Sequence, residues 1–242
     1  MSFKAKESLS EQIAQHLAKQ IIHGDMLAGD RIQELRVAGE LDVSRGSVRE
    51  ALLILQRRQL IDILPRRGAV VKEMSEAHVR SLYEVMQVLL GLVIRKAIKV
   101  VREEDLDAFI ELVHGLQVAA EDRDLDAFFV LSFQFLEHAY PFARNVFVED
   151  ILINMQPAMQ RAYFMALHLE ADEVKECLSF FKALVETIFR RDVRSALEII
   201  REFAEHQSEL VEESITGPAR SKPPGARAGV NKFPLALCRQ AA

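Results

Sequence analysis

The chain opens with apolar residues at helical spacing. Four of them recur every fourth residue and so share one face of an amphipathic helix: Leu9, Ile13, Leu17 and Ile21. Ser8 precedes Glu11 by three residues, the spacing of a capping box, so this helix is expected to begin after Ser8. A shorter helical pattern follows over about 35–41.

A third helix is predicted after Ser44, because serine is a favoured N-cap residue. One apolar stripe runs along it and consists of Val48, Ala51, Leu52 and Leu55. Arg49 falls roughly 120° from the centre of that stripe, so its side chain is expected to point outward. Apolar and polar positions then alternate over 60–64 and 69–72, which predicts a β-hairpin. The turn between these strands reads Pro65-Arg66-Arg67-Gly68.

The rest of the chain is helical nearly without interruption and carries no strand pattern. Helices are predicted at about 76–100, 103–121, 124–140, 144–168, 171–190 and 193–213. The expected fold class is therefore mainly α: an N-terminal winged helix-turn-helix over 1–74, followed by an all-helical bundle over 75–214. The last stretch, 215–242, has Pro, Gly and Ala without apolar period and is expected to be a disordered tail.

Charge divides along the same boundaries. Residues 1–74 carry 12 Lys/Arg against 10 Asp/Glu, and residues 75–214 carry 14 against 26. The tail has five basic residues and no acidic one. An acidic body with a more basic head fits a protein that contacts phosphates at one end only.

Several other classes of protein find no support in the residues. There is no Gly-rich phosphate loop and no nucleophile with a base beside it, so no enzyme activity and no cofactor are expected. The N-terminus lacks an export signal, the longest apolar stretch is too short to span a bilayer, and the two cysteines suggest reduced thiols. A cytoplasmic protein without membrane association is the expectation.

Three helices followed by a wing place the third helix where its first turns can enter the major groove of DNA. Arg45, Ser47 and Arg49 lie on those turns, and an arginine can donate two hydrogen bonds to one guanine. Arg66 and Arg67 at the wing can pair with phosphates or lie in the minor groove. The predicted partner is double-stranded operator DNA.

The segment VSRGSVREALLILQRRQLIDILPRRGAVV resembles the DNA-binding domain of the GntR family, whose recognition helix has the form V-S-R-x-x-V-R-E-A-L. This resemblance implies that Arg45 and Arg49 read guanines and that Ser44 and Ser47 help to hold the DNA backbone. It also implies that Gly68 lets the wing approach the groove.

Some members of that family place a further arginine early in the second helix. Here Leu35 precedes Arg36, so the contact is either shifted to Arg36 or absent. A small reading head of this kind needs a second half-site, so a homodimer on a symmetric operator is expected.

The six predicted helices after the head resemble the FCD effector domain found in the fatty-acid-regulator branch of the family. Many such domains hold a divalent metal through one aspartate and three histidines. Alignment on Asn145 and Asp192 puts Ser132, Leu136, Phe181 and Phe203 at those positions, and none is the expected ligand. Met86 and Leu90 replace an arginine and a glutamate that are common in such domains. No metal is therefore expected.

Two interpretations of these replacements remain open. The cavity is either a lipophilic pocket for a small apolar or acyl-type effector, or it has closed into ordinary core. In the first case the chain is a regulator whose operator affinity responds to that effector; in the second it binds DNA constitutively. The residues expected around the pocket are Met86, Leu90, Ser132, Leu136, Asn145, Phe181 and Phe203.

Overall fold

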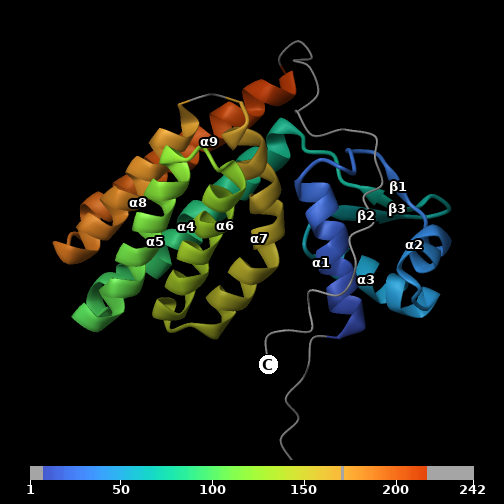
Figure 1. Cartoon of the computed structure of the whole chain (residues 1–242), viewed down its shortest axis with the longest axis horizontal. Helices are drawn as coiled ribbons and strands as arrows, with labels where there is room; N and C mark the ends of the chain where they lie inside the picture. Colours follow the sequence, from blue (N-terminus) through green and yellow to red (C-terminus); the bar gives the residue numbers. More distant parts are fainter. Residues whose placement is uncertain (1–7, 170–171, 217–242) are drawn as a thin grey trace, which may run out of the picture.

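The computed structural model describes residues 8–169 and 172–216, arranged as a small head and a larger helical body (Figure 1). The head contains α1 (Leu9–Ile22), β1 (Arg31–Ile32), α2 (Glu34–Leu41), α3 (Arg45–Arg57), β2 (Ile61–Leu64) and β3 (Gly68–Val71). The body contains α4 (Glu76–Val100), α5 (Glu103–Glu121), α6 (Leu125–Ala139), the 3-10 helix η1 (Tyr140–Ala143), α7 (Val146–Leu167), α8 (Glu173–Phe189) and α9 (Val193–Thr216).

The head has the predicted winged helix-turn-helix architecture. Ser8 caps α1 by accepting a hydrogen bond from the Glu11 amide, as its spacing indicates. The apolar stripes of α1 and α3 pack against each other in one core. The predicted hairpin is present as β2 and β3, with Leu64 opposite Gly68 at its tip.

One strand of the head was not predicted. The segment Arg31–Ile32 forms β1 and pairs antiparallel with β3, so the sheet has the order β1-β3-β2. Two residues are too few to show an alternating pattern, so the sequence pattern does not predict this strand. Its consequence is that β3 is the central strand of the wing and not an edge.

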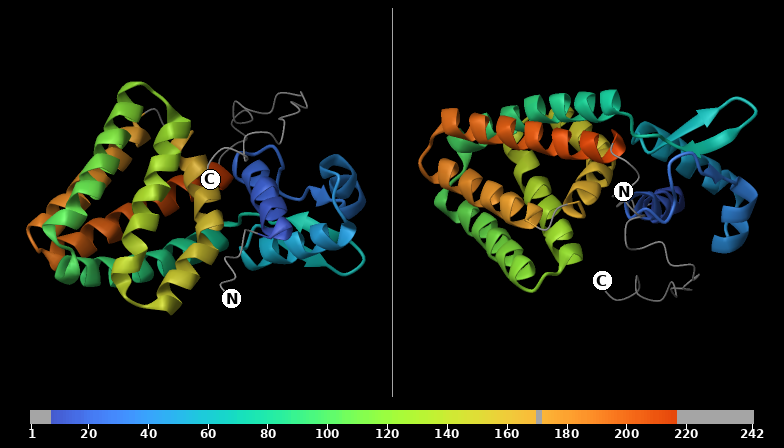
Figure 2. Two further views of the ribbon diagram at one scale, coloured as in Figure 1. Left: turned by 60° about the horizontal axis from the view of Figure 1, so that its bottom comes forward. Right: turned by 90° about the horizontal axis from the view of Figure 1, so that it is seen from above.

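The helices of the body follow the predicted ones closely. Figure 2 shows α4 and α9 side by side along one edge of the bundle, where they pack against each other. The helix predicted over 124–140 ends at Ala139 and continues as the 3-10 turn η1, which contains Pro141. The helix α9 runs on to Thr216, so 215 and 216 are helical, and the rest of the predicted tail lies outside the described residues.

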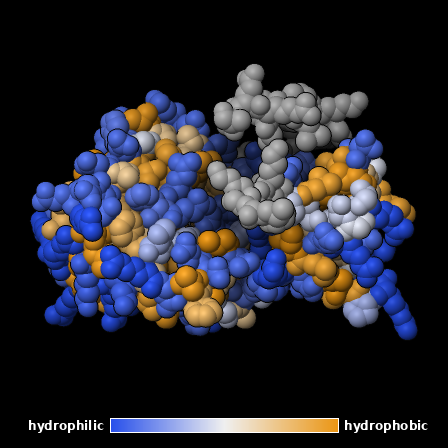
Figure 3. All heavy atoms as spheres, turned by 90° about the horizontal axis from the view of Figure 1, so that it is seen from below, coloured by the Kyte–Doolittle hydropathy of each residue, from blue (hydrophilic) through white to orange (hydrophobic). Residues whose placement is uncertain are grey.

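Among the described helices, α4 is long and apolar enough to cross a membrane by length and composition. The central helix of a folded domain passes the same test. Here α4 packs against α7, α8, α9 and η1, and residues such as Val79, Met86 and Val93 belong to the core. On the face shown in Figure 3, hydrophobic residues form separate groups among hydrophilic ones, without a continuous apolar belt.

Candidate functional site

The first turn of α3 is set by a serine cap. The Ser44 hydroxyl accepts a hydrogen bond from the Ser47 amide at 3.1 Å, and the two hydroxyls lie 2.9 Å apart. Val48 is fully buried one residue later and anchors the helix in the head. Both serines therefore have structural roles at the start of the helix.

Arg45 and Arg49, on the first turns of this helix, are both exposed, which agrees with the outward orientation predicted for Arg49. An Arg45 guanidinium nitrogen lies 3.6 Å from the Glu34 carboxylate of α2, with more than half of the arginine side chain exposed. Such an exposed pair contributes little stability and leaves the guanidinium free to move. An exposed pair of arginines on the first turns of α3 suits contacts with base edges.

Arg36 lies on the exposed surface of α2 and pairs with Glu40, one turn further along the same helix, at 2.7 Å. This contact is local to α2. Among the described residues, no ion pair links Arg36 to Arg45 or Arg49. The contact with Glu40 uses only the Nε–H group, so the other N–H donors of this exposed guanidinium are left free.

The wing tip presents Arg66 and Arg67, both exposed. Arg66 has φ 64° and Gly68 has φ 77°, so the turn uses the left-handed region twice. Arg31 on β1 is a wing residue that the sequence analysis missed: its guanidinium lies beside Gly68, 3.9 Å from where a side chain there would begin. The head therefore has three arginines at its wing.

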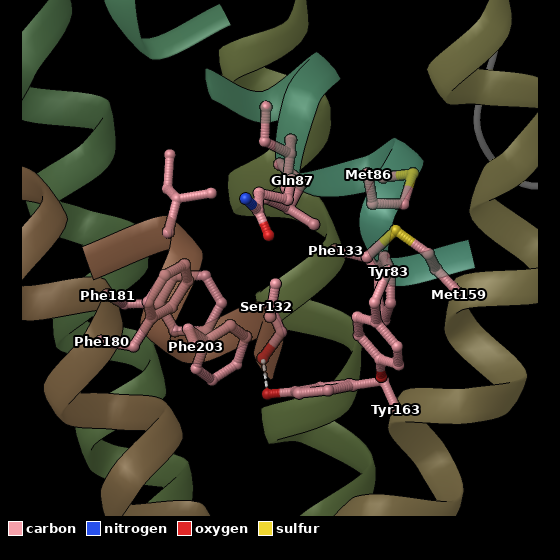
Figure 4. A pocket seen from close by; sticks show the side chains of 14 residues that line it. Tyr83, Met86, Gln87, Ser132, Phe133, Met159, Tyr163, Phe180, Phe181 and Phe203 are labelled. Atoms are coloured by element: carbon pink, nitrogen blue, oxygen red, sulfur yellow. Dashed lines mark hydrogen bonds between the residues drawn. The ribbon is translucent and has the colours of Figure 1, made fainter. Parts of the chain in front are cut away.

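The body contains a cavity of about 40 Å³ among α4, α6, α7, α8 and α9. Its lining consists of Tyr83, Met86, Gln87, Leu90, Ser132, Phe133, Leu136, Met159, Tyr163, Phe180, Phe181, Ile200, Phe203 and Ala204. Six of the seven residues expected at the pocket are in this set. Figure 4 shows these side chains converging from several helices, with the Phe180 and Phe203 rings stacked at 3.8 Å between centroids.

Asn145, which was also expected at the pocket, is not among the residues that line this cavity. Asn145 is the N-cap of α7, and its side-chain oxygen accepts hydrogen bonds from the Phe147 and Val148 amides at 3.1 and 3.4 Å. Asparagine is a strong N-cap because it satisfies the free amides of a first helical turn. Its structural role explains its place after η1 without any ligand.

Four residues of the lining carry polar side-chain atoms, although the surface that faces the cavity is almost entirely apolar: Tyr83, Gln87, Ser132 and Tyr163. Of these the sequence analysis named only Ser132. Tyr83, Gln87 and Leu90 recur at helical spacing on α4, so the periodicity around Met86 could have found the first two. Tyr163 lies on α7, where the alignment with metal-binding FCD domains placed no ligand position, and Phe180 lies on α8, where it placed only Phe181.

Among the described residues, no group of three or more His, Cys, Asp or Glu side chains is arranged to hold a metal ion. The positions aligned with metal ligands, Ser132, Leu136, Phe181 and Phe203, do meet at the cavity. Their side chains make that meeting point apolar, since only the serine carries an oxygen.

Helix α7 contacts both the cavity and the head. Met159 and Tyr163 line the cavity, while Arg161 between them is buried and donates a hydrogen bond to the Lys72 carbonyl oxygen at 2.6 Å. Burial lowers the pKa of Arg161 to about 10, so the guanidinium stays charged at neutral pH. Lys72 directly follows the central wing strand, β3.

A second contact between head and body is aromatic. His23, the C-cap of α1, lies against Phe164 of α7 and Phe129 of α6, with ring centroids 4.6 and 5.9 Å away. Burial lowers the pKa of His23, which keeps the imidazole mainly neutral at pH 7 and compatible with these rings. Together with the short linker to Ser75, the N-cap of α4, these contacts fix the head against α7.

The fold and the exposed arginines define a winged-helix DNA-binding protein with a helical second domain. Residues 9–71 match the model of the bacterial regulatory proteins of the gntR family, and residues 81–206 match the FCD domain. The chain belongs to the GntR family, as a DNA-binding transcriptional regulator with an FCD effector-binding domain.

Curated relatives agree with this assignment. The chain is 27% identical over 217 residues to the HTH-type transcriptional repressor RspR of Escherichia coli, covering 86% of this chain and 95% of that protein. It is 27% identical over 172 residues to the gluconate operon transcriptional repressor of Bacillus subtilis, covering 71% and 70%.

The fold of this chain is similar to that of E. coli McbR/YncC, with a TM-score of 0.73 and 19% identity. The match covers 86% of this chain and 99% of that one. It is also similar to the fold of a putative transcriptional regulator GntR from Rhodococcus sp. RHA1. The TM-score is 0.67, the identity is 16%, and the match covers 84% of this chain and 96% of that one.

Proposed function

We propose that this regulator binds a symmetric operator as a homodimer in the cytoplasm and that a small apolar or acyl-type effector in the body cavity changes its operator affinity. The observation that carries the proposal is the apolar cavity whose wall includes α7, the helix that also holds the wing through Arg161. On the DNA side, Arg45 and Arg49 read bases, and Arg31, Arg66 and Arg67 contact the backbone or minor groove.

The volume of the cavity sets a condition on this proposal. A cavity of about 150 Å³ is known to hold benzene, so 40 Å³ is too small for an effector of that size without movement of the lining. Met86 and Met159 are unbranched and can change rotamer at low cost. We therefore infer that effector binding enlarges the cavity and displaces α7.

The alternative is a constitutive DNA-binding protein whose helical domain is closed core. A screen with purified protein separates the two. Thermal shift and operator affinity are measured with aliphatic alcohols, amides and acyl derivatives, and with citrate and short dicarboxylates, alongside elemental analysis. Stabilisation by the lipophilic set with a change in operator Kd supports the effector. Stoichiometric metal or a response to the acids alone contradicts it, and no response favours the closed core.

A prediction about coupling follows from the Arg161 contact. Arg161→Met keeps a similar side-chain length and removes the hydrogen bond to the Lys72 carbonyl. Allosteric coupling typically changes affinity 5- to 150-fold; in this variant we expect the ratio of operator Kd with and without an active probe to fall close to one. Fluorescence anisotropy with labelled operator measures that ratio.

The matched control is Arg190→Met, since Arg190 is the exposed C-cap residue of α8 and its ion pair with Glu186 is local to that end of the helix. It should keep the full response. An unchanged ratio in Arg161→Met would show that α7 does not act through this contact.

A further inference from the structure

The polar groups around the cavity select a ligand by charge. Tyr83, Gln87, Ser132 and Tyr163 are all uncharged, and no Lys, Arg, His, Asp or Glu is among the lining residues. A charged ligand group would leave water without gaining an opposite charge, which is strongly unfavourable. This composition already disfavours a free carboxylate or phosphate in the cavity.

Two of the four polar groups, the hydroxyls of Ser132 and Tyr163, already use their protons in hydrogen bonds. The Ser132 hydroxyl donates to the Phe128 carbonyl oxygen at 2.8 Å, so its only proton is in use. The Tyr163 hydroxyl, 3.2 Å from the Ser132 oxygen, is then the donor in that pair, drawn as the dashed line in Figure 4. Neither hydroxyl is left to donate to a ligand.

Tyr83 is different. The residue is 5% exposed, and its hydroxyl oxygen is buried without a hydrogen-bond partner among the described residues. A buried, unpaired hydroxyl costs stability, and such groups in native proteins call for an explanation. Burial also raises the pKa of Tyr83, so the group is a neutral phenol with a proton to donate. Figure 4 shows the Gln87 amide projecting among the lining side chains, where it has no drawn partner either.

A buried carboxyl group, that of Glu173, lies close enough to Tyr83 and Tyr163 to interact with them electrostatically. The Glu173 side chain is 1% exposed and accepts hydrogen bonds from Gln207 and, at 3.2 Å, from the Cys177 thiol; His206 lies 2.9 Å from its second oxygen. Besides burial, the nearby Glu173 carboxyl opposes ionisation of both Tyr83 and Tyr163, while burial raises the pKa of Cys177 and keeps it a neutral thiol. The same field repels an anion brought to the Tyr83 hydroxyl.

We propose that the cavity binds a neutral amphipathic molecule, whose apolar part packs among the phenylalanine and methionine side chains and whose head group accepts a hydrogen bond from Tyr83, and that it rejects anions of the same length. This rests on the proposed effector function and narrows it: acyl amides, esters and alcohols fit the site, and free fatty acids do not.

The test uses ligands that differ only in the head group. Isothermal titration at pH 7.5 compares octanamide and 1-octanol with octanoate and octylamine, and repeats the comparison with the four-carbon series. We expect the neutral compounds to bind at least about tenfold more tightly than either ion. Octanoate binding as tightly as octanamide overturns the proposal, and so does binding by no compound of either length.

Two tyrosine variants test the role of the hydroxyl. Tyr83→Phe should weaken octanamide binding about five- to tenfold, the loss of one hydrogen bond, without lowering the Tm of the free protein, because the hydroxyl has no partner there. Tyr140→Phe is the control: its hydroxyl is also buried and unpartnered, but Tyr140 does not line the cavity. It should leave octanamide binding unchanged. Equal effects of both variants would contradict a contact with Tyr83.

These results are distinguishable from failure of the proposed function. Tight binding of octanoate with a change in operator affinity would keep the effector function and overturn only the preference for neutral ligands. Octanamide binding that leaves operator Kd unchanged would support the ligand class and contradict the effector function.

Discussion

Arg49→Ala is expected to reduce specific operator binding by about 1–3 kcal/mol, or roughly 5- to 150-fold, because it removes hydrogen bonds to base edges. The fold should be unaffected, since Arg49 is exposed on α3 and alanine is the best helix former. Gel shift or anisotropy with operator and with scrambled DNA of the same length measures the effect. Scrambled DNA should bind nearly as before, so the specificity ratio falls.

Two controls separate this loss from a general loss of charge. Arg66→Ala at the wing tip should weaken binding to all sequences alike and lower the dependence of log K on log salt by about one. Arg95→Ala, an exposed arginine on α4 of the body, should change neither. If Arg49→Ala bound operator as the native chain does, α3 would not be the recognition helix.

Val88→Glu is expected to abolish the proposed homodimer and with it most of the operator affinity. Val88 is 68% exposed in the middle of α4, and Val85, three residues before it, is 44% exposed on the same face. Exposed apolar side chains on a helix face are typical of a protein interface. If the two subunits of the proposed homodimer meet at this face, a glutamate on each would bring like charges together there.

Loss of the second reading head removes the avidity of two linked half-sites, which commonly amounts to a factor of 10² or more. Light scattering at micromolar concentration and operator titration measure the two effects. The control is Val130→Glu, because Val130 of α6 is also an exposed valine, at 51%. A Val88→Glu dimer with native operator affinity would place the interface elsewhere.

The helices and the hairpin were predictable because each repeats one period over many residues. The stripe that ends at Leu55 and the cap at Ser44 determine α3 locally, and both hold in the structure. The strand Arg31–Ile32 shows no period of its own, since it exists only through its pairing with Val70 and Ala69. Local patterns carry no information about such long-range pairing.

The same division applies to the cavity. Alignment brought six residues together correctly because their family positions share a pocket, but it could not show that Tyr83 has a free hydroxyl. It also could not show that two charged residues, Glu173 and Arg161, are buried. Charged residues are mostly exposed, and these two are buried only because Gln207 and the Lys72 carbonyl lie beside them in space.

The position of α7 between cavity and head has a consequence for how the regulator would behave among large amounts of DNA. Under the proposed function, binding of an effector in the cavity and binding of the operator are thermodynamically linked. Such linkage is reciprocal. An effector that lowers the affinity for DNA by some factor therefore binds the DNA-bound protein more weakly by the same factor. A molecule on its operator would thus need a higher effector concentration to respond than a free one. Non-specific DNA that binds the head in the same conformation as the operator does would also lower the affinity for the effector.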